Sequence, residues 1–197
     1  MRVAAVVLAD GVARRSGRSA SKALLAIEGE PIIRRAVRRA LRAGASPVIV
    51  VVGHEAPQVR AAVADLECKC VVIPPVRSAR ALHAALPLLG RDCDAMLVMD
   101  GSIPRVSERM LVALVGAARR SPAPLVVSRY GDHTAPPLLF RRALFAELLA
   151  SNGDGACKPV VQHHRNDAMY LDWAPSVLAS VGGPRKQRPV RARAMKK

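Results

Sequence analysis

Glycines, cations and hydroxyl groups crowd into one short segment near the start of the chain. From Gly11 to Lys22 the sequence reads GVARRSGRSASK, with two glycines, four cations and three serines. Glycine lets backbone amides approach an anion, and Arg or Lys forms charge-assisted hydrogen bonds with phosphate oxygens. A Walker A loop is excluded because Gly17 is followed by Arg18 and not by lysine, and no GxGxxG pattern occurs. The segment predicts a phosphate-binding loop, and a solvated basic loop is the alternative.

A carboxylate stands at the end of a second apolar run. Residues 95–99 are apolar, and Asp100 follows them and opens a Gly-Ser-Ile-Pro turn. Mg²⁺ usually takes one or two carboxylates together with substrate phosphates. An Asp at this place can instead cap its own turn through an Asx hydrogen bond. Asp100 is therefore a candidate metal ligand, with a structural turn as the other interpretation.

Alternating apolar runs and amphipathic segments must position these two groups. Continuous apolar runs are typical of parallel strands covered on both faces, and the segments between them have helical periodicity. Ligands bind beyond the carboxyl ends of such strands. The pattern predicts a three-layer α/β sandwich with a mostly parallel, Rossmann-like sheet. We expect strands at residues 3–9, 47–52, 70–73, 95–99, 125–130, 138–140 and 169–173, and helices at 31–42, 57–66, 78–89, 107–120 and 141–151.

The composition indicates a basic α/β domain with a tail. The chain has 197 residues, a net charge of +16 and a pI near 11.2, which favours polyanionic ligands such as nucleotides, phosphorylated substrates or RNA. Residues 1–181 are predicted to form one domain, and residues 182–197, rich in Gly, Pro and cations, a disordered basic tail. The four cysteines follow no zinc or redox spacing. Without a long apolar run or a signal-peptide pattern, we expect a cytoplasmic protein that does not enter a membrane.

Three parts of the sequence resemble a known family. The segment LADG, followed by Lys22-Ala-Leu-Leu, resembles the LAAGxSxRMGxxKxLL signature of the MobA-like nucleotidyltransferases, which include molybdenum-cofactor guanylyl- and cytidylyltransferases. The spacing from Gly11 to Lys22 is two residues longer and is similar to that of the methylerythritol-phosphate cytidylyltransferases. Asp100-Gly-Ser-Ile-Pro resembles the DAARP of that second group. Residues 129–156 are similar to the RYxGxxGHPxxFxRxLFxELxxLxGDxGAR of the molybdopterin group.

The resemblance implies a sheet of the GT-A type, a mechanism and a set of site residues. A nucleoside triphosphate, CTP or GTP, would lie in the loop, and a phosphate oxygen of a phosphorylated small-molecule acceptor would attack its α-phosphorus with loss of pyrophosphate. Such chemistry needs positioning and charge neutralisation more than a protein nucleophile. Arg15 and Lys22 would be the catalytic cations, and Mg²⁺ would be held by Asp100 and Asp172. The implied nucleotide-binding residues are Leu8, Ala9, Gly11, Arg15, Lys22 and Ala81.

Several departures from the family pattern leave a second function open. Asp10 replaces an Ala of the signature and brings a negative charge beside the expected triphosphate, Ser16 replaces a Met, and Pro136 stands at the His of GHP. A non-catalytic homologue that binds RNA or a large assembly is the alternative. Its support is the net charge, an arginine-lined helix at residues 34–42 and the basic tail.

A pair of adjacent histidines lies outside both proposals. His163-His164 beside Asp167 would suit a metal, but neighbouring residues on a strand point apart. We expect the pair to lie in a solvated loop.

Overall fold

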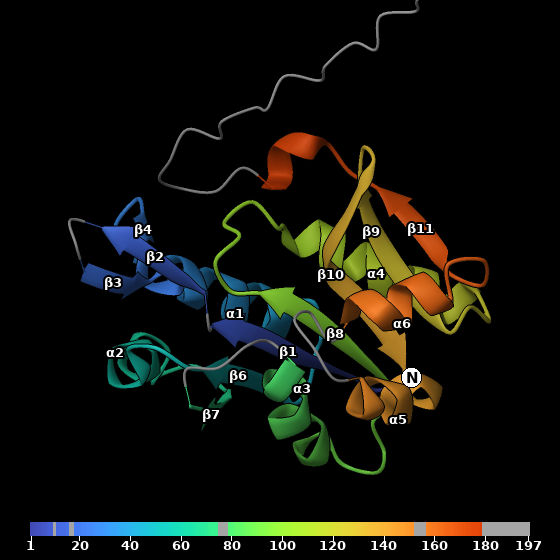
Figure 1. Ribbon diagram of the computed structural model, residues 1–197, viewed down its shortest axis with the longest axis horizontal. Coiled ribbons are helices and arrows are strands. Elements are labelled where there is room, and N and C mark those ends of the chain that lie inside the picture. Colours follow the sequence, from blue (N-terminus) through green and yellow to red (C-terminus); the bar gives the residue numbers. More distant parts are fainter. Residues whose placement is uncertain (10, 16–17, 75–78, 152–156, 179–197) are drawn as a thin grey trace, which may run out of the picture.

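A seven-stranded sheet forms the middle layer of the molecule (Figure 1). The computed structural model describes residues 1–9, 11–15, 18–74, 79–151 and 157–178. The strands of this sheet are β1 (Val3–Ala9), β6 (Val48–Val52), β7 (Lys69–Val72), β8 (Ala95–Asp100), β9 (Leu125–Tyr130), β10 (His133–Arg141) and β11 (Met169–Asp172).

The strand order is β7-β6-β1-β8-β10-β9-β11. Of these seven strands, only β10 runs antiparallel to its neighbours. The inner strands β1, β6 and β8 are almost entirely buried, as expected for apolar runs covered on both faces. The predicted three-layer α/β fold with a mostly parallel sheet is confirmed.

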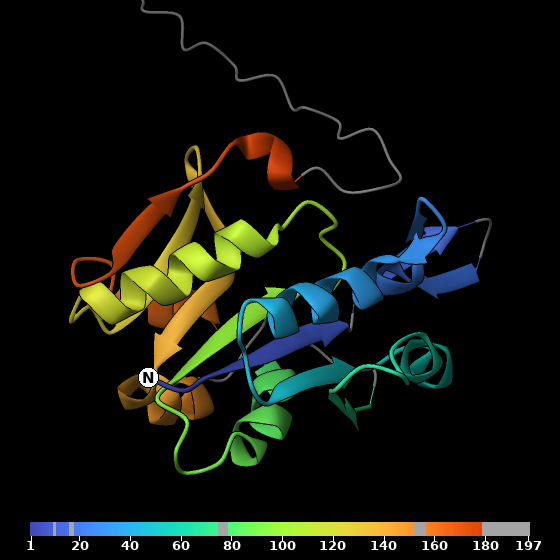
Figure 2. The same cartoon turned by 180° about the vertical axis from the view of Figure 1, so that it is seen from behind.

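Helices cover both faces of the sheet. Helices α1, α2 and α4 contribute to the hydrophobic cluster on one face, and α3, α5 and α6 contribute to the cluster on the other. The first face is turned to the viewer in Figure 2, and the second in Figure 1. The helices are α1 (Ile32–Arg42), α2 (Ala56–Ala62), α3 (Ala79–Ala85), α4 (Glu108–Arg120), α5 (Phe145–Ala150) and α6 (Cys157–His163), with 3-10 helices η1 (Lys22–Leu24), η2 (Leu86–Leu88), η3 (Arg142–Leu144) and η4 (Pro175–Leu178).

The ends of the two long helices follow from their sequences. Helix α1 buries an apolar stripe that includes Ile33 and Val37, and the chain leaves it through Gly44, whose φ of +79° suits glycine. Helix α4 begins at the predicted cap, where the Ser107 hydroxyl accepts a hydrogen bond of 3.3 Å from the amide of Met110.

Three local features differ from the sequence-based expectations. The expected phosphate loop contains a β-hairpin, because β2 (Val12–Arg15) pairs antiparallel with β3 (Arg18–Ser21). A further short ladder joins β4 (Ala26–Ile27) to β5 (Glu30–Pro31). The expectation that His163 lies in a loop is wrong, because it is the last residue of α6, a helix that was not predicted.

Two other expectations concern membrane-spanning helices and the basic tail. No helix among the described residues is long and apolar enough to cross a membrane. The predicted tail, residues 182–197, lies outside the described residues.

The turn after β8 requires glycine at position 101. A Cβ atom built on Gly101 would lie 2.7 Å from Cδ1 of Ile33, 3.0 Å from the carbonyl oxygen of Leu8 and 3.2 Å from Cγ1 of Val7. Ile33 is fully buried and cannot retreat easily. The absence of a side chain therefore allows the Asp100 turn to pack directly on β1.

We expect Gly101→Ala to destabilise the fold by about 1–3 kcal/mol, the usual cost of overpacking a core. Urea unfolding measures the change. The matched control is Gly116→Ala within α4, where the added Cβ meets only the flexible end of Arg120 and alanine favours the helix. Equal stability of Gly101→Ala and the wild type would show that this packing is not restrictive.

Candidate nucleotide site

The hairpin brings Lys22 back to the end of β1. Val12 pairs with Ser21 in the β2–β3 ladder, and the next pair is closed by a hydrogen bond of 3.0 Å from the Lys22 amide to the Gly11 carbonyl. Helix η1 begins at Lys22. The segment predicted to bind phosphate thus places a glycine and a lysine opposite each other at the carboxyl edge of the sheet.

Glu55 anchors the hairpin from the side. Its Oε2 accepts a hydrogen bond of 2.6 Å from the amide of Ser21, which is buried next to Lys22. Glu55 has a φ of 54°, a left-handed conformation that is unusual for this residue type. Sequence reasoning missed Glu55, because its partner is 34 residues away and only the fold brings the two together.

Asp100 lies on the strand beside β1. Its Cα pairs with that of Leu8, and the amide of Gly101 donates a hydrogen bond of 2.8 Å to the Leu8 carbonyl. Both the amide and the hydroxyl of Ser102 donate to Asp100 Oδ1, at 2.8 and 2.6 Å. Asp100 therefore makes the Asx turn that was the structural alternative.

The Asx turn uses only one oxygen of the Asp100 carboxylate. Within the part of the chain that the structure describes, Oδ2 of Asp100 has no hydrogen-bond partner. The half-buried carboxylate thus keeps one oxygen available for a ligand. A turn-forming role and a metal-binding role are compatible at this residue.

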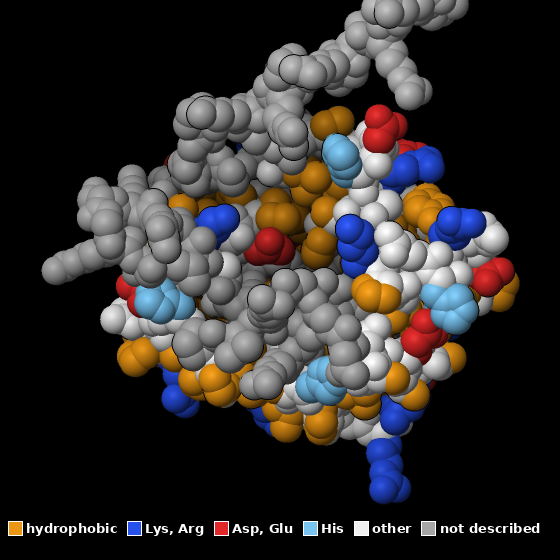
Figure 3. Space-filling model, viewed as in Figure 1, with side chains coloured by type: hydrophobic (Ala, Val, Ile, Leu, Met, Phe, Trp, Pro, Cys, Tyr) orange, Lys and Arg blue, Asp and Glu red, His pale blue; other side chains and the backbone are white. Residues whose placement is uncertain are grey.

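The two predicted segments meet at Gly11. A Cβ atom built on Gly11 would lie 3.8 Å from the Ser102 hydroxyl and 3.9 Å from Cδ of Lys22. The Lys22 side chain is exposed and, among the described residues, has no ion-pair partner. The face in Figure 3 is hollowed near its centre, where an acidic surface lies between basic side chains. The exposed Lys22 side chain and the Ser102 hydroxyl of the Asp100 turn therefore both lie beside Gly11.

The remaining predicted nucleotide-binding residues differ in accessibility. Leu8 is half-buried at the end of β1, whereas the side chains of Ala9 and Ala81 are buried in the core, at 1% and 0% exposure. Ala9 and Ala81 could therefore contact a nucleotide only through their backbone atoms, and both stay predicted nucleotide-binding residues. The side chain of Arg15, together with Asp10, lies outside the described residues.

The structure does not bring Asp172 to Asp100. Arg129 holds Asp172 through two hydrogen bonds, from Nε at 2.5 Å and from Nη2 at 2.8 Å, and these bonds lower the pKa of the Asp172 carboxyl. Strands β8 and β11 are separated by β10 and β9, so three strand spacings place the two backbones about 14 Å apart. The predicted pairing of these carboxylates on one ion is not formed in this conformation.

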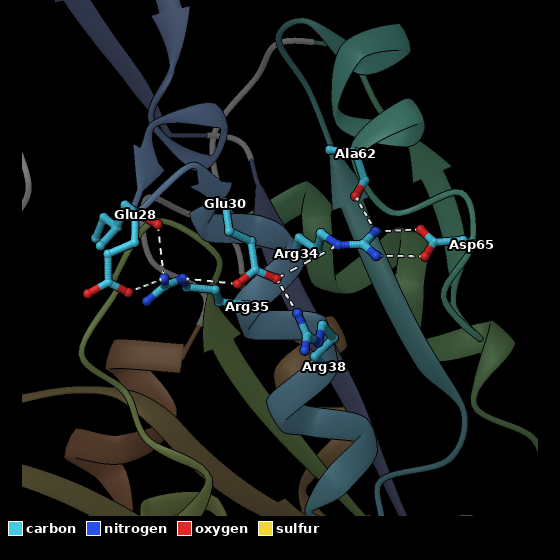
Figure 4. Close-up of polar contacts among 8 residues, drawn as sticks. Glu28, Glu30, Arg34, Arg35, Arg38, Ala62 and Asp65 are labelled. Carbon is cyan, nitrogen blue, oxygen red and sulfur yellow. Dashed lines mark hydrogen bonds and ion pairs between the residues drawn. The ribbon is translucent and has the colours of Figure 1, made fainter.

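The arginines of α1 form ion pairs within the fold (Figure 4). Glu30 lies between three of them, 3.8 Å from Nε of Arg34, 3.2 Å from Nε of Arg35 and 2.5 Å from Nη1 of Arg38. Arg34 also makes a two-pronged contact with Asp65, and its Nη2 donates at 2.6 Å. These contacts neutralise much of the charge that the sequence places on this helix.

Arg39 on the same helix also forms hydrogen bonds within the fold. Its Nη1 donates to the carbonyl oxygens of Pro104 and Val106, both at 2.7 Å, and burial lowers its pKa. Helix α1 therefore offers less free positive charge than the RNA-binding alternative assumes from the sequence.

The fold and the family model together identify the class of protein. The mostly parallel, seven-stranded sheet with helices on both faces is a Rossmann-like α/β fold, and its first strand leads into a basic hairpin. More specifically, the chain belongs to the family described as MobA-like NTP transferase domain, which matches residues 5–168. The resemblance seen in the sequence is confirmed.

Known proteins support this assignment. The bifunctional protein GlmU of Anaeromyxobacter dehalogenans (strain 2CP-1 / ATCC BAA-258) is 36% identical over 126 residues, which cover 61% of this chain and 26% of GlmU. The chain thus matches about a quarter of that relative's length.

A solved structure is similar over nearly the whole chain. The crystal structure of Rv0371c from Mycobacterium tuberculosis H37Rv is 27% identical, has a TM-score of 0.79 and covers 91% of this chain and 92% of its own. The complex of Rv0371c with manganese is 26% identical, has a TM-score of 0.75 and covers 88% of this chain and 89% of its own.

Proposed function

We propose that this protein transfers a nucleoside monophosphate from a nucleoside triphosphate to a phosphorylated small-molecule acceptor and releases pyrophosphate. The observation that carries the proposal is the meeting of Lys22, Gly11 and the Asp100 turn at the carboxyl edge of the sheet. Family membership supplies the reaction class, because the family is one of NTP transferases.

The hairpin would bind the phosphates of the nucleotide. The Lys22 ammonium is a mobile point charge at the rim of the site, and Gly11 has no side chain to obstruct an anion. A Cβ on Gly11 would make only ordinary van der Waals contacts, so neighbouring protein atoms do not demand glycine here. Glycine leaves room for a ligand, and we assign Arg15 as the second cation on that ligand.

The donors at Asp100 fit a hard divalent cation. A carboxylate oxygen without a protein partner is the ligand that Mg²⁺ prefers, and the ion takes its other ligands from phosphates and water. Asp100 would hold it, and such an ion would supply charge neutralisation on the phosphate oxygens. Rv0371c binds manganese, which supports a divalent cation in this fold. Asp172 would contribute only after release from Arg129.

The chemical step needs no protein nucleophile. A phosphate oxygen of the acceptor forms a bond to the α-phosphorus, and the bond from that phosphorus to the bridging oxygen breaks. Pyrophosphate leaves with the electron pair. Lys22 stabilises the negative charge that develops on the leaving group, which is the kind of electrostatic stabilisation that dominates such reactions.

A labelled-nucleotide assay tests the proposed reaction. CTP, GTP or ATP labelled at the α-phosphate is incubated with Mg²⁺, the full chain and a pool of phosphorylated small molecules. We expect the label to enter a new product while pyrophosphate is released, with CTP or GTP preferred. Transfer of the γ-phosphate with release of a nucleoside diphosphate would contradict the proposed reaction.

A further inference from the structure

Glu147 of α5, His163 at the end of α6 and the next residue, His164, lie in contact with one another. The Glu147 carboxylate on α5 contacts Nδ1 of His163 through Oε1 at 2.8 Å and Nε2 of His164 through Oε2 at 2.7 Å. The two imidazole rings lie 4.6 Å apart, centre to centre. One ligand atom from each of the three residues lies within 4.8 Å of the other two. The three side chains thus converge on one point at the surface.

We propose that Glu147, His163 and His164 form a binding site for a transition-metal dication of the Zn²⁺ type. Imidazole nitrogens and carboxylate oxygens are the ligands that such ions prefer. Tetrahedral bonds of about 2.0–2.1 Å put neighbouring ligand atoms about 3.4 Å apart. In the structure the two imidazole nitrogens lie 2.8 and 2.7 Å from the carboxylate oxygens, and the three ligand atoms lie within 4.8 Å of one another, so the present separations bracket this value.

The cluster has the accessibility that a metal needs. The His163 side chain is 73% exposed, whereas those of Glu147 and His164 are 33% and 20% exposed. A bound ion would take its remaining ligands from water on the exposed side. Because α5 and α6 each supply at least one ligand, the ion would join the two helices more firmly than the hydrogen bonds do.

This site is separate from the nucleotide site. Strand β10 runs antiparallel to β8 and delivers the chain to α5 at the amino edge of the sheet, and β11 starts from the same edge after α6. Asp100 and Lys22 lie at the opposite, carboxyl edge. The metal proposal therefore does not depend on nucleotidyl transfer.

Titration of the full, untagged chain with Co²⁺ and Zn²⁺ tests the proposal. We expect one Co²⁺ per chain with weak visible bands and no intense thiolate charge-transfer band, since nitrogen and oxygen ligands hold the ion. His163→Ala and His164→Ala together should weaken binding at least about 100-fold, and Glu147→Gln at least about 10-fold. The exposed His133 provides the matched control, because His133→Ala should leave binding unchanged.

Thermal unfolding separates metal binding from a purely structural role. Zn²⁺ should raise the melting temperature of the wild type and of His133→Ala, but not that of the double histidine variant. Failure to bind either ion, binding unchanged in the double variant, or a thiolate band would each overturn the proposal. If the double histidine variant melts at a lower temperature than the wild type and Zn²⁺ changes neither melting temperature, the cluster stabilises the contact between two helices and does not bind metal.

Discussion

Replacing Lys22 with alanine is expected to weaken nucleoside-triphosphate binding about 30-fold. The Lys22 side chain is exposed, lies against Gly11 and has no ion-pair partner among the described residues, so its charge is available to an anion. A hydrogen bond to a charged group contributes about 2 kcal/mol, and this corresponds to the stated change in Kd. Calorimetric titration of the variant with the best-bound nucleotide and Mg²⁺ measures the effect.

Lys69→Ala is the matched control for this variant. Lys69 is an exposed lysine at the start of β7, at the edge of the sheet away from Gly11. Both variants lose one positive charge, so any effect of net charge alone on nucleotide affinity should appear in both. We expect Lys69→Ala to bind nucleotide as the wild type does. Equal weakening in both variants would mean that the net charge, and not a contact with Lys22, attracts the nucleotide.

Asp100→Asn is expected to lower the rate of nucleotidyl transfer about 100-fold or more, the scale of losing one preorganised electrostatic group. Asparagine keeps an oxygen for the hydrogen bonds from Ser102, so the turn should remain intact. It replaces the other oxygen, the proposed metal ligand, by an amide nitrogen that does not bind Mg²⁺.

Whether Asp100→Asn weakens or strengthens nucleotide binding should depend on whether Mg²⁺ is present. With Mg²⁺, Asp100→Asn should bind nucleotide more weakly than the wild type, because the ion that joins carboxylate and phosphates is lost. In EDTA the variant should bind at least as tightly, because a negative charge near the phosphates has been removed. Asp172→Asn is the comparison, since Arg129 already neutralises that carboxylate. A loss of the same size in both media would assign Asp100 a structural role alone.

The fold was predictable because its signals are local. The apolar run from Val3 to Ala9 becomes the buried central strand β1, and Ser107 caps α4 as expected. Helix α6 was missed because only Val160 and Val161 in it are buried, too few to show a helical stripe in the sequence. Without that helix, the two histidines at its end could not be placed beside Glu147.

The site was predictable only in outline. Glycine, lysine and aspartate near strand ends pointed to Gly11, Lys22 and Asp100, because topology alone brings such ends together. The supporting contacts could not be predicted, since the bond of Glu55 to the Ser21 amide and the pairing of Asp172 with Arg129 join segments 34 and 43 residues apart. Likewise, the sequence suggested a free basic face on α1, whereas the structure shows Glu30 in ion pairs with Arg35 and Arg38.

Calorimetric titration of the full wild-type chain with CTP, GTP and ATP, in Mg²⁺ and again in EDTA, tests most directly whether a triphosphate occupies the space between Lys22 and Asp100. At least one nucleotide should bind with a Kd on the order of micromolar in Mg²⁺, and at least about ten-fold more weakly in EDTA. Absence of binding by all three nucleotides at millimolar concentration, or an affinity that ignores the metal, would contradict this placement.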